Sequence, residues 1–438
     1  MITTPHPGPQ TRKILQRLRA VEAAAALTHG IADEPVVLHR ASGAVIEDPD
    51  GNLFLDMVAG FGSLNLGHSH PRLIAAVSDQ LARGQQAMSL ASTVRTDLVE
   101  RLAAVANFDC RVLLTSSGTE AVETALKFAR RATGRHGVVA FSGAFHGRTM
   151  GALTLMGRAS ERQGLGALIP GVVHLPYPDA YRPPLGTSPD DVSEKTLALL
   201  DHQLSDPASG WMEVGAVIIE PVQGNGGMIA APGGFLTGLR ELCSKHGALL
   251  IVDEVMSGFH RTGRRFAFEF EDGLSPDIIV LGKSLSAGIP LSGLLLSAEV
   301  AGAGPSGSES STYAGNLVSC AAALVAMDIY QEEDFSSRAA ALGDHALDVL
   351  NSDLGHHPNV GDIRGTGLML AVELVEDRAT RQPLPIARSL SDLATRRGLL
   401  VYPGGHYGNV IALLPPLIAT ERQLTTASSI LRELLNAL

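Results

Sequence analysis

Short apolar runs alternate with amphipathic stretches through the middle of the chain. The runs are short enough to be buried strands, and the stretches between them have helical spacing. This alternation predicts a mostly parallel sheet with helices on its faces. The strands are expected at residues 112–114, 138–141, 214–219, 248–252 and 278–281. A helix follows the first of them and stops at Gly134, with these apolar positions on one face: Val122, Ala125, Leu126 and Ala129.

The two ends of the chain have a different pattern. The first ten residues are rich in proline, and residues 11–27 are expected to form a helix. Apolar pairs on either side of Asp50-Gly51 predict a hairpin. From about Ser336 onward, helices and short strands mix as in a smaller α+β domain. We therefore expect an N-terminal segment at 1–70, a large domain at 71–330 and a C-terminal small domain at 331–438.

Composition narrows the class of protein. The 438 residues carry a net charge of −11, with no basic run longer than a pair, which argues against partners such as nucleic acid or a membrane surface. The three cysteines have no metal-type spacing, so we expect no metal site and a reducing compartment. Neither a signal segment nor an apolar run of membrane-spanning length is present, and a cytoplasmic enzyme is the expectation.

A polar or Gly-rich segment follows each of the five expected strands. These segments are Ser116–Thr119, Phe145-His146, Glu220, Asp253 and Lys283. Ligands of open α/β sheets bind beyond the carboxyl ends of the strands. The five segments should therefore meet in one crevice, although they are distant in sequence.

Lys283 and Asp253 are the most informative of these residues. Taken alone, Lys283 is most simply a solvated lysine at a strand end; the alternative is a desolvated amine that forms a Schiff base with an aldehyde cofactor. Asp253 follows an apolar run, where an unpaired carboxylate is costly. It could cap the next helix. A protonated pyridine nitrogen is a better partner, because that charge keeps the ring able to accept electrons.

A phosphate site is expected where the first strand turns into its helix. Free N–H groups and the helix dipole at Ser117-Gly118-Thr119 favour an anion, although many such turns only cap the helix. Phe145 could stack on a flat ring, although an aromatic residue near a strand end is more often part of the core. The expected ligand is therefore a phosphorylated aromatic aldehyde, because the site would combine a lysine, a carboxylate, a phosphate-binding loop and an aromatic ring.

Ordered motifs along nearly the whole chain, from about Ala41 to Leu417, carry a family resemblance. They are Asp50-Gly51-Asn52, Gly67-His68-Ser69-His70-Pro71, Ser117–Glu123, Phe145–Thr149, Glu220–Gly224, Asp253-Glu254-Val255, Gly258-Phe259, Arg261-Thr262-Gly263, Lys283 and Ser311–Asn316. The chain resembles the class III (ornithine and 4-aminobutyrate type) aminotransferases, which are pyridoxal-phosphate enzymes of fold type I. The resemblance implies an α/β large domain with a mostly parallel sheet, and a smaller α+β domain built from the two chain ends.

The resemblance also implies roles for single residues. Lys283 would carry pyridoxal 5′-phosphate and move the substrate proton, and Asp253 would pair with the pyridine nitrogen. The other cofactor-binding positions implied are Ser117, Gly118, Thr119, Phe145, His146, Glu220 and Met256. Thr312 matches a threonine that reaches the phosphate in the neighbouring subunit, which implies a homodimer with shared active sites.

Substrate recognition is implied at four positions. Arg364 matches an arginine that clamps the α-carboxylate of glutamate or 2-oxoglutarate; a surface ion pair is the alternative. Arg148 matches an arginine that binds a distant carboxylate, and Phe61 is a further substrate-binding position. Asn225 stands where the ornithine and 4-aminobutyrate enzymes have a glutamate that masks the arginine at Arg364. Because asparagine cannot make that ion pair, Arg364 is expected to stay open in the resting enzyme.

The expected function is transamination from an amine or ω-amino donor, possible donors including an amino sugar, to 2-oxoglutarate or pyruvate. A racemase, aminomutase or decarboxylase with the same cofactor is the main alternative, and it would need no 2-oxo acid. A regulatory relative that only binds the cofactor is disfavoured, because Lys283 and Asp253 are both present.

Overall fold

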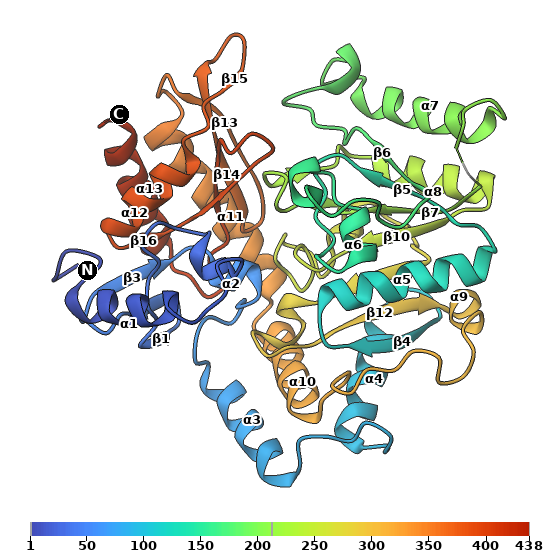
Figure 1. Ribbon diagram of the computed structural model, residues 1–438, viewed down its shortest axis with the longest axis horizontal. Helices are drawn as coiled ribbons and strands as arrows, with labels where there is room; N and C mark the ends of the chain where they lie inside the picture. The colour runs from blue at the N-terminus through green and yellow to red at the C-terminus, as the bar shows by residue number, and fades with distance from the viewer. Residues whose placement is uncertain (1, 212, 438) are drawn as a thin grey trace. The chain divides into compact units, whose positions relative to one another are not determined.

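The computed structural model describes residues 2–211 and 213–437. The chain forms two compact units, which are treated separately below. Unit 1 combines Met1–Pro71 with Ser337–Leu438, and unit 2 is Arg72–Ser336. Figure 1 shows the elements of each. Among the described residues, no helix is long and apolar enough to cross a membrane.

Unit 2 is organised by a seven-stranded sheet. Its order is β4 (Cys110–Thr115), β12 (Ser292–Ser297), β11 (Ile278–Leu281), β10 (Leu249–Asp253), β7 (Val214–Ile219), β5 (Gly137–Phe141) and β6 (Val172–Leu175). The pairs β11–β10, β10–β7, β7–β5 and β5–β6 are parallel, whereas β12 is antiparallel to both of its neighbours. The mostly parallel sheet is therefore confirmed, and β12 and β6 are strands that the sequence analysis did not assign.

Burial on both faces explains the composition of these strands. Every residue of β7 and β11 is buried, as expected for parallel strands covered by helices. Helix α5 (Gly118–Thr133) crosses the sheet (Figure 1), with Val122, Ala125 and Ala129 in the same core cluster as the strands. Its ends follow the expectation: Ser117 caps it, and Gly134 ends it in the left-handed conformation that glycine adopts readily. The strand β4 and the helix α5 therefore fix the position of the turn between them.

The remaining elements of unit 2 precede, connect or follow the strands of the sheet. The helices are α3 (Pro71–Arg83), α4 (Thr93–Val105), α6 (Met150–Thr154), α7 (Val192–Ser205), α8 (Phe235–His246), α9 (Ala298–Gly302) and α10 (Leu317–Glu332). Short 3₁₀ turns occur at η2 (Ala159–Arg162), η3 (Pro184–Gly186), η4 (Ala267–Phe270) and η5 (Lys283–Ser286), and β8 (Val222–Gln223) pairs with β9 (Ile229–Ala230).

Unit 1 contains two small sheets and their helices. One sheet has the order β1 (Arg40–Ser42), β2 (Val45–Glu47), β3 (Leu53–Asp56) and β16 (Leu399–Leu400). The other is built from β13 (Val360–Thr366), β14 (Met369–Asp377), β18 (Val410–Leu413) and β17 (Tyr402–Gly404), with β15 (Gln382–Pro383) beside β14. The helical elements are α1 (Pro9–Arg19), η1 (Leu27–His29), α2 (Ala59–Gly62), α11 (Phe335–Leu354), α12 (Ala387–Arg396) and α13 (Glu421–Leu435).

Two expectations for the N-terminal segment have different outcomes. The hairpin around Asp50-Gly51 is confirmed as β2 and β3. The helix expected over residues 11–27 is wrong in its extent, because α1 ends at Arg19. Val21 and Leu27 beyond it are 86% and 58% exposed, so they bury little apolar surface and cannot stabilise further helical turns.

Candidate active site

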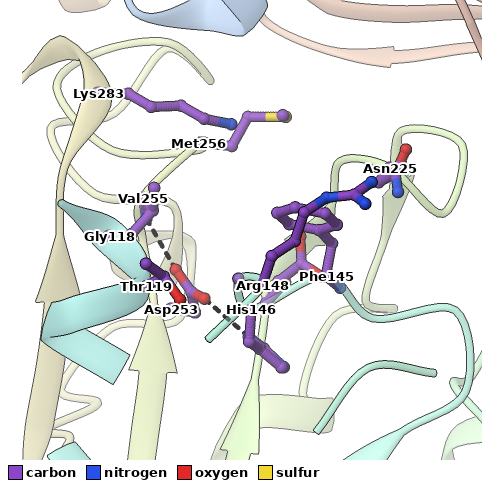
Figure 2. A pocket seen from close by; sticks show the side chains of 12 residues that line it. Gly118, Thr119, Phe145, His146, Arg148, Asn225, Asp253, Val255, Met256 and Lys283 are labelled. Carbon is purple, nitrogen blue, oxygen red and sulfur yellow. Dashed lines mark hydrogen bonds and ion pairs between the residues drawn. The ribbon is translucent and has the colours of Figure 1, made fainter. Parts of the chain in front are cut away.

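A cavity of about 280 Å³ lies at the carboxyl edge of the unit 2 sheet. It is lined by residues that follow β4, β5, β7, β10 and β11, and the convergence expected from the sequence is confirmed. The lining residues are Gly118, Thr119, Phe145, His146, Gly147, Arg148, Glu220, Asn225, Asp253, Val255, Met256 and Lys283. In Figure 2 the Lys283 side chain reaches in beside Met256, and Phe145 and Arg148 lie across the cavity from it.

Lys283 is held in an unusual environment directly after β11. Its backbone φ is 41°, in the left-handed region that strains any residue with a Cβ. Burial lowers the pKa of its amine to about 8; the nearby negative charges of Glu220 and Asp253 oppose that effect, and the positive charge of Arg261 adds to it. The amine therefore loses its proton far more readily than an ordinary lysine.

Asp253 and His146 form a buried pair on the floor of the cavity. His146 Nδ1 lies 2.7 Å from Asp253 Oδ2, and their side chains are 0% and 4% exposed. Burial alone would lower the pKa of His146, but its hydrogen bond to Asp253 and the negative charges of Asp253 and Glu220 outweigh that effect and raise it. The other carboxylate oxygen, Oδ1, accepts the backbone N–H of Val255 at 3.0 Å. Asp253 thus makes a local backbone contact and also faces the cavity.

Glu220 connects two of the loops around the cavity. Its Oε1 accepts the N–H of Phe145 at 2.9 Å, and its Oε2 accepts the N–H of Gly224 at 3.0 Å. Burial raises the pKa of this carboxyl, and the nearby negative charge of Asp253 adds to the effect. Tyr177 donates from its hydroxyl to the Glu220 carbonyl at 3.0 Å and so supports the same turn.

The turn before α5 has the features of an anion site. The hydroxyl of Ser116 is buried and has no hydrogen-bond partner among the residues that the structure describes. Ser117 accepts the N–H of Glu120 at 3.4 Å, so its hydroxyl serves the helix cap. Thr119 Oγ1 lies 2.7 Å from Thr149 Oγ1 and lines the cavity. Gly147, at φ 127°, lies so close to Thr119 that any Cβ there would collide with its side chain.

Val255 holds three parts of the cavity together. A Cβ added to Gly118 would lie 3.1 Å from Val255 Cγ1, and one added to Gly282 would lie 3.2 Å from the same atom. Only glycines allow this approach without movement of the valine. One side chain therefore joins three segments. Val255 belongs to the loop after β10, which ends at Asp253, and it packs against the start of α5 and the end of β11 before Lys283.

The other sequence-expected residues lie outside the cavity lining. Thr312, in the loop before α10, is exposed, and its carbonyl accepts from Gln86 Nε2 at 2.5 Å. In unit 1, Phe61 has a φ of 57° and packs edge-on against Tyr402, with ring centroids 5.2 Å apart.

Arg364 lies on β13 of unit 1 and already has partners. Its Nη1 is 2.8 Å from Asp362 Oδ2 and 2.7 Å from Glu373 Oε2, and Glu373 is only 3% exposed. Burial would lower the pKa of Arg364, but these two carboxylates raise it. Two carboxylates of its own sheet therefore hold Nη1 of Arg364, and the expectation that its site stays open to a substrate carboxylate remains a prediction.

These observations fit pyridoxal 5′-phosphate. An amine with a lowered pKa, a buried carboxylate and a helix start beside a buried hydroxyl surround one cavity. They match the aldehyde, the ring nitrogen and the phosphate of that cofactor. On a mostly parallel sheet, this arrangement defines the class of pyridoxal-phosphate-dependent transferases of fold type I.

The comparison with known proteins then gives the family. The family model "Aminotransferase class-III" matches residues 28–435, and the chain belongs to that family. The diaminobutyrate–2-oxoglutarate aminotransferase of Rhizobium meliloti is 36% identical, over 91% of this chain and 87% of that protein. The 4-aminobutyrate aminotransferase of Escherichia coli is 37% identical, over 93% of this chain and 95% of that protein.

Solved structures agree with this assignment. A PLP-bound amine transaminase from an uncultivated Pseudomonas species is 35% identical, with a TM-score of 0.87 over 95% of this chain and 98% of that one. The chain is accordingly a pyridoxal-phosphate-dependent transaminase, which passes an amino group from an amine or ω-amino donor to a 2-oxo acid.

Proposed function

We propose that Lys283 binds the cofactor covalently and moves the substrate proton, and that Asp253 holds the ring nitrogen. The observation that carries this proposal is the convergence of five strand-end segments on one cavity, with these two residues in its lining. When bound, pyridoxal phosphate supplies an aldehyde that accepts the donor's amine and a ring that takes up electrons. The protein's own groups orient the reactants and handle the proton.

The amine of Lys283 is suited to proton transfer. A base acts best when its pKa lies near the working pH, and burial brings this amine to about 8. The strained backbone at φ 41° directs the side chain from the end of β11 into the cavity. Strain of this kind is retained where function requires it.

Asp253 acts as a fixed negative charge. His146 donates from Nδ1 to one carboxylate oxygen and the backbone N–H of Val255 donates to the other, so the carboxylate cannot rotate freely. Each oxygen keeps a further lone pair for a protonated ring nitrogen. Phe145 lies across the cavity from Lys283 (Figure 2), as a residue flanking the ring would.

The phosphate is assigned to the start of α5. The N–H groups of the first helical turn are not used within the helix, and the helix dipole favours an anion there. Gly118 and Thr119 line the cavity, and Ser116 adds a buried hydroxyl. Glu220 and Met256 complete the surroundings of the cofactor, and Ser117 contributes by capping the helix.

Substrate carboxylates are assigned to two arginines. Arg364 binds the carboxylate next to the reacting carbon, and Arg148 binds a distant carboxylate, because a guanidinium fork suits both. Phe61 and Asn225 shape the donor site. Arg364→Ala should then slow the half-reaction with glutamate more than the half-reaction with a neutral amine. Equal slowing of both would show that Arg364 is structural.

The enzyme is further proposed to act as a cytoplasmic homodimer. Thr312 is exposed in its own subunit, as a residue that completes a neighbour's phosphate site would be. Cys110, Cys243 and Cys320 are buried free thiols, which suits a reducing compartment.

Borohydride reduction tests the central assignment. In the wild-type enzyme it should fix the cofactor to the peptide that contains Lys283, and Lys283→Ala should remove both this label and turnover while the circular dichroism spectrum persists. A label on another lysine would refute the assignment. A matched assay without a 2-oxo acid serves as the control, because sustained turnover there would favour a racemase or aminomutase.

A further inference from the structure

Arg148, which is proposed to bind a distant carboxylate, already has a carboxylate partner. Its Nη1 lies 2.9 Å from Glu161 Oε2, and its guanidinium carbon lies 5.8 Å from the centre of the Phe145 ring. The Arg148 side chain is 65% exposed, whereas that of Glu161 is 19% exposed. Glu161 is therefore the more buried of the two partners. Its negative charge already balances the positive charge of Arg148 at the cavity rim before a substrate binds.

The segment that carries Glu161 is anchored to the cavity wall. Glu161 lies in η2, and Arg158, just before this turn, donates from Nη2 to the carbonyl of Asn225 at 2.7 Å. Asn225 itself lines the cavity. One short segment thus contacts two sides of the donor site, through Arg158 at Asn225 and through Glu161 at Arg148.

Glu161 is held in place by the fold, so it competes well for Arg148 with the carboxylate of a substrate in solution. Because Glu161 belongs to the same chain, its effective concentration at Arg148 does not depend on the substrate concentration. A donor with a distant carboxylate must displace Glu161 or share the guanidinium with it. A donor with an uncharged far end leaves the ion pair intact and meets a neutral rim.

We propose that Glu161 is a specificity-determining residue, which masks Arg148 and shifts the preference of this transaminase toward amines without a distant carboxylate. The proposal rests on the proposed role of Arg148 as the ligand of such a carboxylate. Glu161 acts through Arg148 and not on the reacting atoms. Its effect should therefore appear in KM for ω-amino acids and not in kcat.

The test compares two donors of equal chain length, 4-aminobutyrate and butylamine, with pyruvate as the acceptor. Glu161→Gln removes the charge and keeps the shape, so the ratio of kcat/KM for 4-aminobutyrate to that for butylamine should rise about two- to fivefold, the range expected for an ion pair with one exposed partner. Glu194→Gln, an exposed charge change on α7, is the matched control and should leave the ratio unchanged.

An Arg148→Gln background separates the possible outcomes. Arg148→Gln alone should lower the ratio, and adding Glu161→Gln to it should raise the ratio less than Glu161→Gln does in the wild-type enzyme. If Arg148→Gln lowers the ratio but Glu161→Gln does not raise it, the masking role is refuted and the role of Arg148 stands. If neither variant changes the ratio, the assignment of Arg148 fails and the masking proposal fails with it. Absorbance of the bound cofactor verifies that each variant is correctly assembled.

Discussion

The rate at which Lys283 forms its covalent bond to the cofactor should depend on pH, and this dependence should reveal the lowered pKa of the buried amine. Only the uncharged amine attacks an aldehyde, so the rate of covalent attachment follows the neutral fraction of Lys283. With a pKa of about 8, roughly 10% of the amine is neutral at pH 7, against about 0.03% for an ordinary lysine. Burial therefore increases the reactive fraction about 300-fold.

The direction of the pH effect follows from the same pKa. The attachment rate should rise about tenfold per pH unit below pH 8, and it should level off above that value once most of the amine is neutral. Glu220→Gln removes a negative charge that raises the pKa of Lys283, so in this variant the plateau should begin at a lower pH.

Stopped-flow mixing of cofactor-free enzyme with pyridoxal phosphate measures this profile through the absorbance of the bound cofactor. Borohydride trapping and peptide mapping at each pH assign the signal to Lys283. Lys245→Arg, a change at an exposed lysine paired with Asp201, is the control and should reproduce the wild-type profile. A rate that still climbs steeply at about pH 10 would indicate an ordinary lysine, and the argument from burial would fail.

Three further outcomes are expected. Asp253→Asn should reduce turnover by several orders of magnitude at saturating cofactor, because the charge opposite the ring nitrogen is lost; near-normal steady-state activity would show that another group supports the nitrogen. Arg364→Ala should lower the free energy of unfolding by about 3–5 kcal/mol, because it removes the positively charged partner of the buried Glu373. Adding Glu373→Gln should recover part of that loss in urea titrations, and equal stability of the two variants would contradict this account. The enzyme should sediment as a dimer, and Thr312→Val should weaken its affinity for pyridoxal phosphate; a fully active monomer would exclude shared sites.

The sequence predicted the large sheet well because local signals and burial agree there. Strands β5, β7, β10 and β11 are continuous apolar runs, and Ser117 and Gly134 mark the two ends of α5. Parallel strands place their carboxyl ends at one edge, so the meeting of Asp253 and Lys283 followed from topology alone.

The partners of the two arginines could not be predicted in the same way. Glu373 reaches Arg364 because the β13–β14 register sets Arg364 opposite Ala371, which makes Glu373 a diagonal neighbour on the next strand. That register runs unbroken from Thr366 opposite Met369 to Asp362 opposite Glu373, so it follows from the tight connection at residues 367–368, in a region where the sequence analysis assigned no individual strands. Glu161 lies in a short turn without apolar periodicity, and only the folded loop brings it to Arg148.

The packing around Val255 implies that the proposed cofactor site tolerates substitution less well than the cavity rim does. A side chain at Gly118 or at Gly282 would displace the same valine, so a substitution at either position is expected to disturb both the start of α5 and the strand end before Lys283. Arg148 lies on a more exposed rim, where its contacts are the ion pair with Glu161 and the face of the Phe145 ring. We therefore expect single rim substitutions, in natural drift or in directed evolution, to change the preferred donor while the proposed cofactor site keeps its packing.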